Sequence, residues 1–280
     1  MKVLVTGGSG YLGVHVRRFF SADDFSRRSN RDILEPADLS MVGDYDVVIH
    51  LAALLDKRPE SAAEVFRANA EGTANVVSRV REGAVFIYAS TKDVYGANAE
   101  GLAEVAEDCP VEYAGQSALE WSKLIGERYV DYYAVRRNLR ACVFRLSAVY
   151  ARPSEGNEPG FVTSYVESVK RGLPIRLPAR GEPVRDLLHV EDFSRACRAF
   201  VESSVGRGTY NLGGGRANAV SLREIAHTVG RLIERGPVFD LGAPPPAPVP
   251  FDYVSDISRA RRELGWEPRV AVEEGLRSLL

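Results

Sequence analysis

Nearly continuous apolar runs alternate with helix-like segments in the first half of the chain. Such runs are expected of strands that are buried on both faces of a sheet, and they cover residues 2–6, 45–51, 84–89 and 140–146. A further short strand is predicted near residues 24–28. The segments with the apolar spacing of helices cover residues 10–21, 60–82 and 111–137. This alternation predicts an α/β fold with a doubly wound parallel sheet.

The pattern becomes irregular after Tyr150. Residues 151–160 are rich in Gly, Pro and polar side chains, and the proline-rich stretch 241–250 is expected to be an extended linker. Ser221 is expected to cap a helix that runs to about Glu234, because Glu224 three residues later completes a capping box. The other predicted elements are helices at 163–171, 191–203, 257–264 and 272–280 and a strand at 209–212.

Composition restricts the class of protein. The 280 residues are 45% hydrophobic and 26% charged with a net charge of −2, which excludes general disorder and gives no support to nucleic-acid binding. The 3 cysteines form no C-x-x-C motif, so neither a disulfide framework nor a metal site is indicated. No apolar run approaches the length of a membrane span, and the chain opens directly into its first strand. We therefore expect a cytoplasmic protein without a signal peptide.

A glycine-rich turn follows the first predicted strand. Gly7, Gly10 and Gly13 fit the pattern G-x-x-G-x-x-G, and Gly8, Gly10 and Gly13 fit G-x-G-x-x-G. Between a strand and a helix, such glycines allow a tight turn and let backbone N–H groups approach a pyrophosphate at the positive end of the helix. The turn therefore predicts a dinucleotide site, with an ordinary glycine turn as the alternative.

Eight sequence blocks resemble, in order, the nucleotide-sugar epimerase/dehydratase branch of the extended short-chain dehydrogenase/reductase family. They are T-G-G-S-G-Y-L-G at 6–13, D-V-V-I-H-L-A-A at 46–53, N-A-E-G-T-A-N at 69–75, Y-A-S-T-K-D-V-Y-G at 88–96, W-S-K-L-I-G-E at 121–127, R-D-L-L-H-V-E-D at 185–192, Y-N-L-G-G at 210–214 and E-L-G-W-E-P at 263–268. The resemblance covers nearly the whole chain. It implies a Rossmann-type dinucleotide-binding domain from 1–148 plus about 186–212, and a smaller C-terminal substrate-binding lobe from about 149–185 plus 213–280.

The resemblance also implies the ligands. NAD or NADP would lie at the carboxyl ends of the N-terminal strands, and a nucleotide-sugar would lie under the smaller lobe. Arg185 is the candidate for the diphosphate of the sugar nucleotide, with an ion pair to Asp186 or Glu182 as the alternative. The residues at the family's cofactor-binding positions are Gly7, Gly10, Tyr11, Leu12, Arg27, Asp32, Ile33, Leu51, Ala52, Ala53, Asn69 and Lys123.

In such relatives a Ser/Thr, a Tyr and a Lys carry the chemistry. The tyrosine exchanges a proton with a sugar hydroxyl, and the lysine lowers the tyrosine pKa. Thr91 matches the hydroxyl position, where it would also bind substrate, and Lys123 matches the lysine. The tyrosine should lie four residues before Lys123, but that position is Leu119, which cannot exchange a proton. The candidate substitutes are Asp93 and Tyr113, which complete the predicted catalytic set, together with Tyr95 and Glu120.

Two further departures from the family pattern bear on the reaction. Lys92-Asp93 follows Thr91 where dehydratases resemble Thr-Asp-Glu, which disfavours 4,6-dehydration, and Ala148 replaces a common substrate-contacting asparagine. Three explanations remain open for the missing tyrosine. Another group replaces it, or the reaction depends less on proton exchange with the sugar hydroxyl, or the chain binds its ligands without turnover. The leading hypothesis is hydride transfer at a hexose carbon, in epimerisation or keto-reduction. The rival hypothesis is a non-catalytic nucleotide-sugar- and NAD(P)-binding protein.

The choice of cofactor and the oligomeric state complete the expectations. NAD-specific folds place an acidic residue at the end of the second strand, whereas this chain has Arg27 and Arg28 there. Arginines can pair with the 2′-phosphate of NADP, so NADP is slightly favoured over NAD; the alternative is two exposed surface arginines. Relatives often dimerise through the helices expected at 60–82 and 111–137. A homodimer is therefore expected, with no nucleic-acid or membrane partner.

Overall fold

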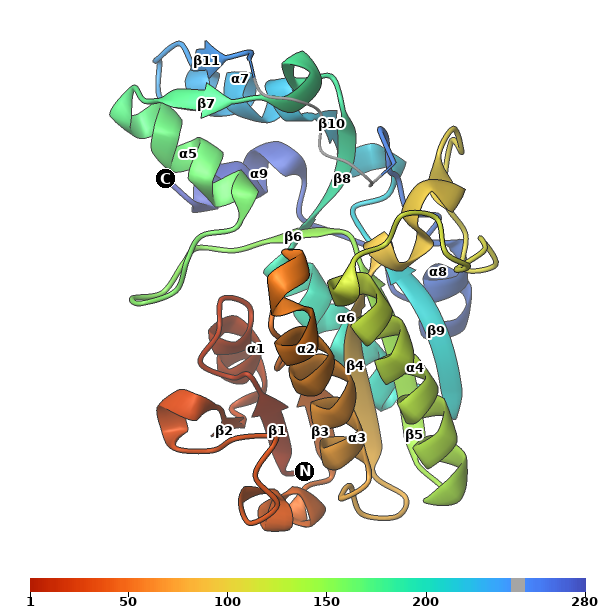
Figure 1. Ribbon diagram of the computed structural model, residues 1–280. Helices are drawn as coiled ribbons and strands as arrows, with labels where there is room; N and C mark the ends of the chain where they lie inside the picture. Colours follow the sequence, from red (N-terminus) through yellow and green to blue (C-terminus); the bar gives the residue numbers. More distant parts are fainter. Residues whose placement is uncertain (243–249) are drawn as a thin grey trace.

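Six parallel strands form the central sheet in the order β2-β1-β3-β4-β5-β9 (Figure 1). The structure is a computed structural model that describes residues 1–242 and 250–280. Each neighbouring pair of these strands is parallel, which confirms the doubly wound sheet predicted from the sequence. The strands are β1 Val3–Thr6, β2 Asp23–Phe25, β3 Val47–His50, β4 Val85–Thr91, β5 Arg140–Leu146 and β9 Arg207–Leu212.

Helices cover both faces of this sheet (Figure 1). Because side chains alternate along a strand, Val5 of β1 enters one core layer and its neighbour Leu4 enters the other. The first layer is closed by α1 Gly13–Phe20, α6 Val190–Glu202 and α8 Ser258–Leu264. The second layer is closed by α3 Gly72–Val77 and α4 Ala118–Arg136, with α2 Ala62–Phe66 packed on α4. The apolar strand runs are thus buried on both faces.

A smaller body follows the carboxyl end of β5 (Figure 1). In one small sheet β8 pairs with β6 in parallel and with β10 in antiparallel orientation, and in another β7 pairs with β11. A separate apolar core lies between these sheets and three helices. The elements are β6 Ala148–Tyr150, β7 Pro174–Arg176, β8 Val184–His189, β10 Ala219–Ser221, β11 Val238–Asp240, α5 Phe161–Arg171, α7 Leu222–Leu232 and α9 Val272–Ser278.

The described residues refine several expectations for this part. Ser221 and Glu224 form the predicted capping box at the start of α7. The proline-rich stretch 241–250 includes residues 243–249, which lie outside the described residues. Within 213–280, α8 packs on the core of the large sheet, and the division into two domains stays a prediction. In residues 1–242 and 250–280 no helix is long and apolar enough to cross a bilayer.

Two predicted helices differ from the structure. The segment 60–82 is not one helix, because a π-helical turn at Arg67–Glu71 separates α2 from α3, which ends at Val77. The prediction of helix at 111–117 is wrong, since α4 begins only at Ala118. Ser117 caps its first turn and forms a capping box with Glu120. Shorter 3-10 turns lie at Arg27–Ser29, Asp38–Asp44, Pro59–Ser61, Lys92–Ala99, Pro178–Gly181 and Arg216–Asn218.

A buried ion pair joins α4 to the sheet. The Arg145 guanidinium of β5 donates to the Glu127 carboxylate of α4 at 2.8 and 3.1 Å, and both side chains are almost fully buried. Ser90 of β4 donates to the same carboxylate at 2.6 Å. Arg145 also donates to the Tyr95 hydroxyl at 3.0 Å, which in turn donates to Asn211 of β9 at 2.7 Å. The position of α4 therefore depends on a polar network beneath it.

Replacing Arg145→Met should reduce the free energy of unfolding by about 3–5 kcal/mol, because it leaves the Glu127 carboxylate buried without its cation. Urea denaturation of the variant measures this loss. The double variant Glu127→Met/Arg145→Met removes both charges and should be more stable than Arg145→Met alone. A single variant within about 1 kcal/mol of the wild type would contradict this role of the pair.

Candidate active site

The glycine turn brings β1, α1 and the segment after β3 into close contact. Gly7 has a φ of +68°, and a Cβ added there would lie 2.7 Å from the backbone nitrogen of Ala52. A Cβ on Gly13 would lie 2.1 Å from the carbonyl oxygen of Gly7. A Cβ on Gly10 would meet only the Gly7 oxygen, at 3.1 Å. Gly7 and Gly13 are thus required by packing, whereas Gly10 leaves an open side that fits a pyrophosphate at the start of α1.

Asn69 fixes the segment that leaves β3. Its side-chain oxygen accepts from the Leu54 N–H at 2.7 Å, and its side-chain nitrogen donates to the Leu54 carbonyl at 3.0 Å. The same nitrogen donates to the Ser122 hydroxyl of α4 at 2.9 Å. One buried amide therefore holds residues 51–58 against α4.

Thr91 and Lys123 lie at the carboxyl end of β4. Thr91 is the last residue of β4, and Lys123 on α4 donates to the carbonyl of Ala89 at 2.8 Å. Burial lowers the pKa of Lys123 to about 8. Leu119 lies one helical turn before Lys123, and only 7% of it is exposed. This turn of α4 carries an apolar side chain where the resemblance implies a proton-exchanging one.

A cluster of charges surrounds the first turn of α4. The Lys57 ammonium lies 2.9 Å from the Asp93 carboxylate and 2.7 Å from the Glu120 carboxylate. Lys92 pairs with the other oxygen of Asp93 and lies 4.8 Å from the ring centre of Tyr253. Although burial alone would raise it, Lys92 and Lys57 hold the pKa of Asp93 well below its usual range. The arrangement can hold an ammonium proton and a carboxylate side by side next to Thr91.

Comparison with known proteins decides the family. The model of the NAD dependent epimerase/dehydratase family matches residues 3–213. The chain belongs to this family. It is 24% identical to the UDP-N-acetyl-alpha-D-glucosaminuronate decarboxylase of Bacillus cytotoxicus over 100% of this chain and 96% of the relative. It is 28% identical to the dTDP-glucose 4,6-dehydratase of Neisseria gonorrhoeae over 99% and 93% of the two chains.

Solved structures of epimerase/dehydratase proteins have the same fold. MoeE5 in complex with UDP-glucose and NAD superimposes with a TM-score of 0.86 at 25% identity, covering 100% of this chain and 97% of that chain. The UDP-glucose 4-epimerase of Thermotoga maritima with UDP-glucose gives a TM-score of 0.83 at 25% identity, with coverages of 100% and 97%. These matches confirm the recognition of the family from the sequence blocks and the Rossmann-type fold.

The structure separates the candidate substitutes for the family tyrosine. Asp93 and Glu120 both contact Lys57, and the Asp93 N–H donates to the Thr91 hydroxyl at 3.2 Å. Tyr113 is 73% exposed on the loop before α4. Tyr95 is fully buried among its partners, and burial raises its pKa to about 12. Asp93 and Glu120 therefore belong to the charged cluster around Lys57, whereas Tyr113 lies on the surface and Tyr95 lies in the polar network beneath α4.

Several residues at the predicted cofactor-binding positions form hydrogen bonds with other residues of the chain. Leu51 and Ala52 donate their N–H groups to the carbonyl and hydroxyl of Thr6 at 3.0 and 3.3 Å, which leads 51–53 past the glycine turn. Tyr11 bonds through its hydroxyl to the backbone of Ala151 at 2.8 Å and to Thr163 at 3.0 Å. It therefore connects the glycine turn to the smaller body. Leu12 stands at the N-cap of α1.

On the predicted adenine side of the site, some residues are engaged in contacts within the fold and one is exposed. The Asp32 carboxylate accepts from the Leu34 N–H at 2.9 Å, which closes a local turn, and Ile33 packs on Gly72. Arg28 donates to the Ser9 carbonyl at 3.1 Å. Arg27 is exposed on a 3-10 turn directly after β2. The cofactor contacts assigned to Arg27, Asp32 and Ile33 stay predictions.

Arg185 has a different environment from either sequence-based alternative. Its guanidinium donates to the carbonyls of Val184, Phe251 and Pro250 at 2.6, 2.7 and 3.2 Å. In the part of the chain that the structure describes it has no carboxylate within ion-pair distance, and Asp186 instead accepts from the N–H groups of Gly215 and Ser255. The alternative ion pair to Asp186 or Glu182 is therefore wrong. The diphosphate role of Arg185 stays a prediction.

Lys57 is the site residue that sequence reasoning missed. It follows the block 46–53 by only four positions, and the cations Lys57 and Arg58 lie in the segment that leaves the carboxyl end of β3. That placement was a usable signal, because side chains at the carboxyl ends of parallel strands gather at one edge. Its partners Asp93 and Glu120 are distant in sequence and could not be paired with it from spacing.

Proposed function

We propose that the chain is an NAD(P)-dependent enzyme that acts by hydride transfer on a nucleotide-sugar hexose, as an epimerase or 4-keto-reductase. The observation that carries this proposal is the buried Lys123, which bonds to Ala89 two residues before Thr91. Membership of the epimerase/dehydratase family supports it. So do related structures that hold UDP-glucose or UDP-glucuronic acid together with NAD.

Each site residue has a role in this proposal. The dinucleotide, when bound, supplies or accepts a hydride. The open side of Gly10 and the start of α1 hold its pyrophosphate, and Lys123 holds the nicotinamide ribose. Thr91 donates a hydrogen bond to the reacting sugar oxygen, which orients the hexose.

Dehydration does not fit this site. Water elimination needs a protonated acid at the leaving hydroxyl, and the only carboxyl beside Thr91 in the dehydratase-like segment is Asp93. Lys57 and Lys92 keep Asp93 ionised, so it cannot give a proton. The second candidate function is ligand binding without turnover, and the burial of Leu119 in place of a proton-exchanging residue favours it.

Turnover of UDP-glucose, UDP-glucuronic acid, dTDP-glucose and their 4-keto derivatives with NAD(P) or NAD(P)H tests the function. Mass spectrometry and cofactor absorbance should show product with the wild-type protein. Leu119→Tyr adds a phenol one turn from Lys123, and Leu119→Phe is the control for size alone. Activity only in Leu119→Tyr would establish the binding function. Binding of sugar nucleotide and cofactor without turnover in the wild type would overturn the enzymatic one.

We also propose that NADP is preferred over NAD. Asp24, the last carboxylate of β2, lies 3.4 Å from Arg17 and accepts from the Ser26 hydroxyl at 3.0 Å, so it is engaged within the fold. Exposed Arg27 follows and can pair with a 2′-phosphate.

The dissociation constants of NADPH and NADH, measured by fluorescence, check this preference. Arg27→Ala should weaken NADPH binding about tenfold, the loss of one charge-assisted contact, and leave NADH binding unchanged. Arg31→Ala is the control, because Arg31 is a nearby arginine that pairs with Asp38. Equal affinities for both dinucleotides in the wild type would contradict the proposal.

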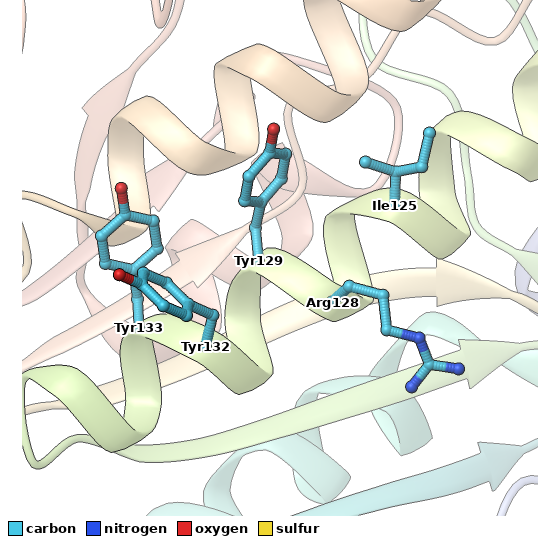
Figure 2. A pocket seen from close by; sticks show the side chains of 5 residues that line it. All are labelled: Ile125, Arg128, Tyr129, Tyr132 and Tyr133. Atoms are coloured by element: carbon cyan, nitrogen blue, oxygen red, sulfur yellow. The ribbon is translucent and has the colours of Figure 1, made fainter.

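We further propose a homodimer formed through α4. Figure 2 shows Ile125, Tyr129, Tyr132 and Tyr133 along one surface of this helix. Tyr132 is 56% exposed and Val135 is 63% exposed. Exposed aromatic residues on one helix face are typical of an interface, and the family resemblance implies a dimer through the helices expected at 60–82 and 111–137.

Tyr132→Glu should convert the dimer to a monomer, because it places a charge in the centre of this face. Sedimentation velocity at micromolar concentration measures the change. Tyr113→Glu is the matched control, since Tyr113 is also an exposed tyrosine but lies outside α4. A wild-type protein that sediments as a monomer would contradict the dimer.

A further inference from the structure

Lys57 lies close to the turn of α4 in which Leu119 stands at the tyrosine position. Its ammonium lies between Asp93, two residues after Thr91, and Glu120, the residue directly after Leu119. An ammonium has three N–H donors; one is donated to Asp93, and the Glu120 carboxylate oxygen lies within ion-pair distance at 2.7 Å. The side chain is 48% exposed, so the third N–H can face a ligand or solvent.

The chain fixes the backbone on both sides of Lys57. Asn69 holds Leu54 through two hydrogen bonds. Asp56 accepts from the Arg58 N–H at 2.9 Å, from the Arg58 guanidinium at 2.7 Å and from the Ser61 hydroxyl at 2.7 Å. These contacts engage the two charged neighbours of Lys57 with each other. Lys57 alone extends toward α4.

We propose that Lys57 replaces the missing tyrosine as the proton donor to a sugar carbonyl oxygen, which makes this a site for keto-sugar reduction. The assignment rests on the proposed function and narrows it to one direction. The observation behind it is the pairing of one half-exposed ammonium with Asp93 and Glu120 beside Thr91.

The charges around Lys57 set the direction of proton transfer. Burial alone would lower the pKa of Lys57, but Asp93 and Glu120 raise it above its ordinary value of 10.5. Lys57 is therefore protonated at neutral pH, and it can give a proton but cannot accept one. Oxidation of a sugar hydroxyl needs a base, whereas reduction of a carbonyl needs an acid. The cluster meets the second requirement.

The proton and electron balance is simple. The carbonyl carbon gains a hydride from the reduced nicotinamide dinucleotide, which is the co-reactant, and the C=O π pair moves to the oxygen. That oxygen takes a proton from Lys57, whose N–H pair stays on nitrogen, and the ketone becomes an alcohol while the dinucleotide is oxidised. Thr91 donates a hydrogen bond to the same oxygen. The Lys57 amine then regains a proton from water through its exposed side.

Three variants separate proton donation from charge balance. Lys57→Arg keeps a cation beside Asp93 and Glu120, but a guanidinium does not release its proton in proteins. Lys57→Met removes both the charge and the proton. Lys170→Met is the matched control, because Lys170 is also a lysine paired with a carboxylate, Glu167 at 3.2 Å, but lies on α5.

The first measurement needs no substrate. Reductive ¹³C-methylation labels the lysines, and the signal that disappears in Lys57→Arg identifies Lys57 in the NMR spectrum. The charged groups around it are Asp93 and Lys92 from one side and Glu120 from α4, while its neighbours Asp56 and Arg58 pair with each other. Its titration midpoint should lie above the ordinary lysine value of 10.5 and should fall in Asp93→Asn. A midpoint that does not respond to Asp93→Asn would overturn the proposal.

The second measurement is reduction of dTDP- and UDP-4-keto-6-deoxyglucose by NADPH. Both Lys57→Met and Lys57→Arg should lower kcat about 10²–10⁴-fold, with unchanged NADPH affinity, and Leu119→Tyr should restore part of the rate to Lys57→Met. Wild-type kcat should fall at high pH as Lys57 loses its proton.

The outcomes distinguish the two proposals. A Lys57→Arg variant with kcat within about twofold of an active wild type shows that only the charge matters, and it overturns the donor role while the proposed function stands. A wild type that binds NADPH and keto-sugar but forms no product overturns the proposed function and this assignment with it.

Discussion

The buried pairing of Glu127 with Arg145 sets the position of the helix on which the candidate site is built. A carboxylate inside a protein is costly unless it is paired and hydrogen-bonded, and here Arg145 from β5 and Ser90 from β4 provide both. α4 can therefore lie in only one register over the sheet. That register brings Lys123 to the carbonyl of Ala89 and the start of α4 to the end of β4. The chemistry at the edge of the sheet depends on this polar contact below it.

The large sheet and the glycine turn could be predicted because their signals are local. Buried parallel strands are short apolar runs, and Gly7 and Gly13 are demanded by contacts within one strand–turn–helix unit. The start of α4 also has a local signal, which is the capping box formed by Ser117 and Glu120. The expectation of a helix from residue 111 rested on apolar spacing and did not include this capping box. The same box was read correctly at Ser221.

The polar part of the site could not be predicted because its contacts join distant segments. The amide of Asn69 bonds to Leu54 and Ser122, and neither partner could be named from the sequence. For Arg185 the residue type left an ion pair to Asp186 or Glu182 open, whereas its guanidinium donates to the backbone carbonyls of Val184, Pro250 and Phe251. Residue type indicated only that each side chain can form several hydrogen bonds. Only the tertiary structure shows which partner each one binds.

Glu120 serves two purposes with one carboxylate. One oxygen accepts from the N–H and hydroxyl of Ser117 and so defines where α4 begins, and the other lies against Lys57. The folding signal of the helix and the electrostatics of the site therefore cannot vary independently. Replacing this carboxylate would remove the cap of a helix as well as an ion pair, so a change in the electrostatics of the site at this position also changes the stability of α4.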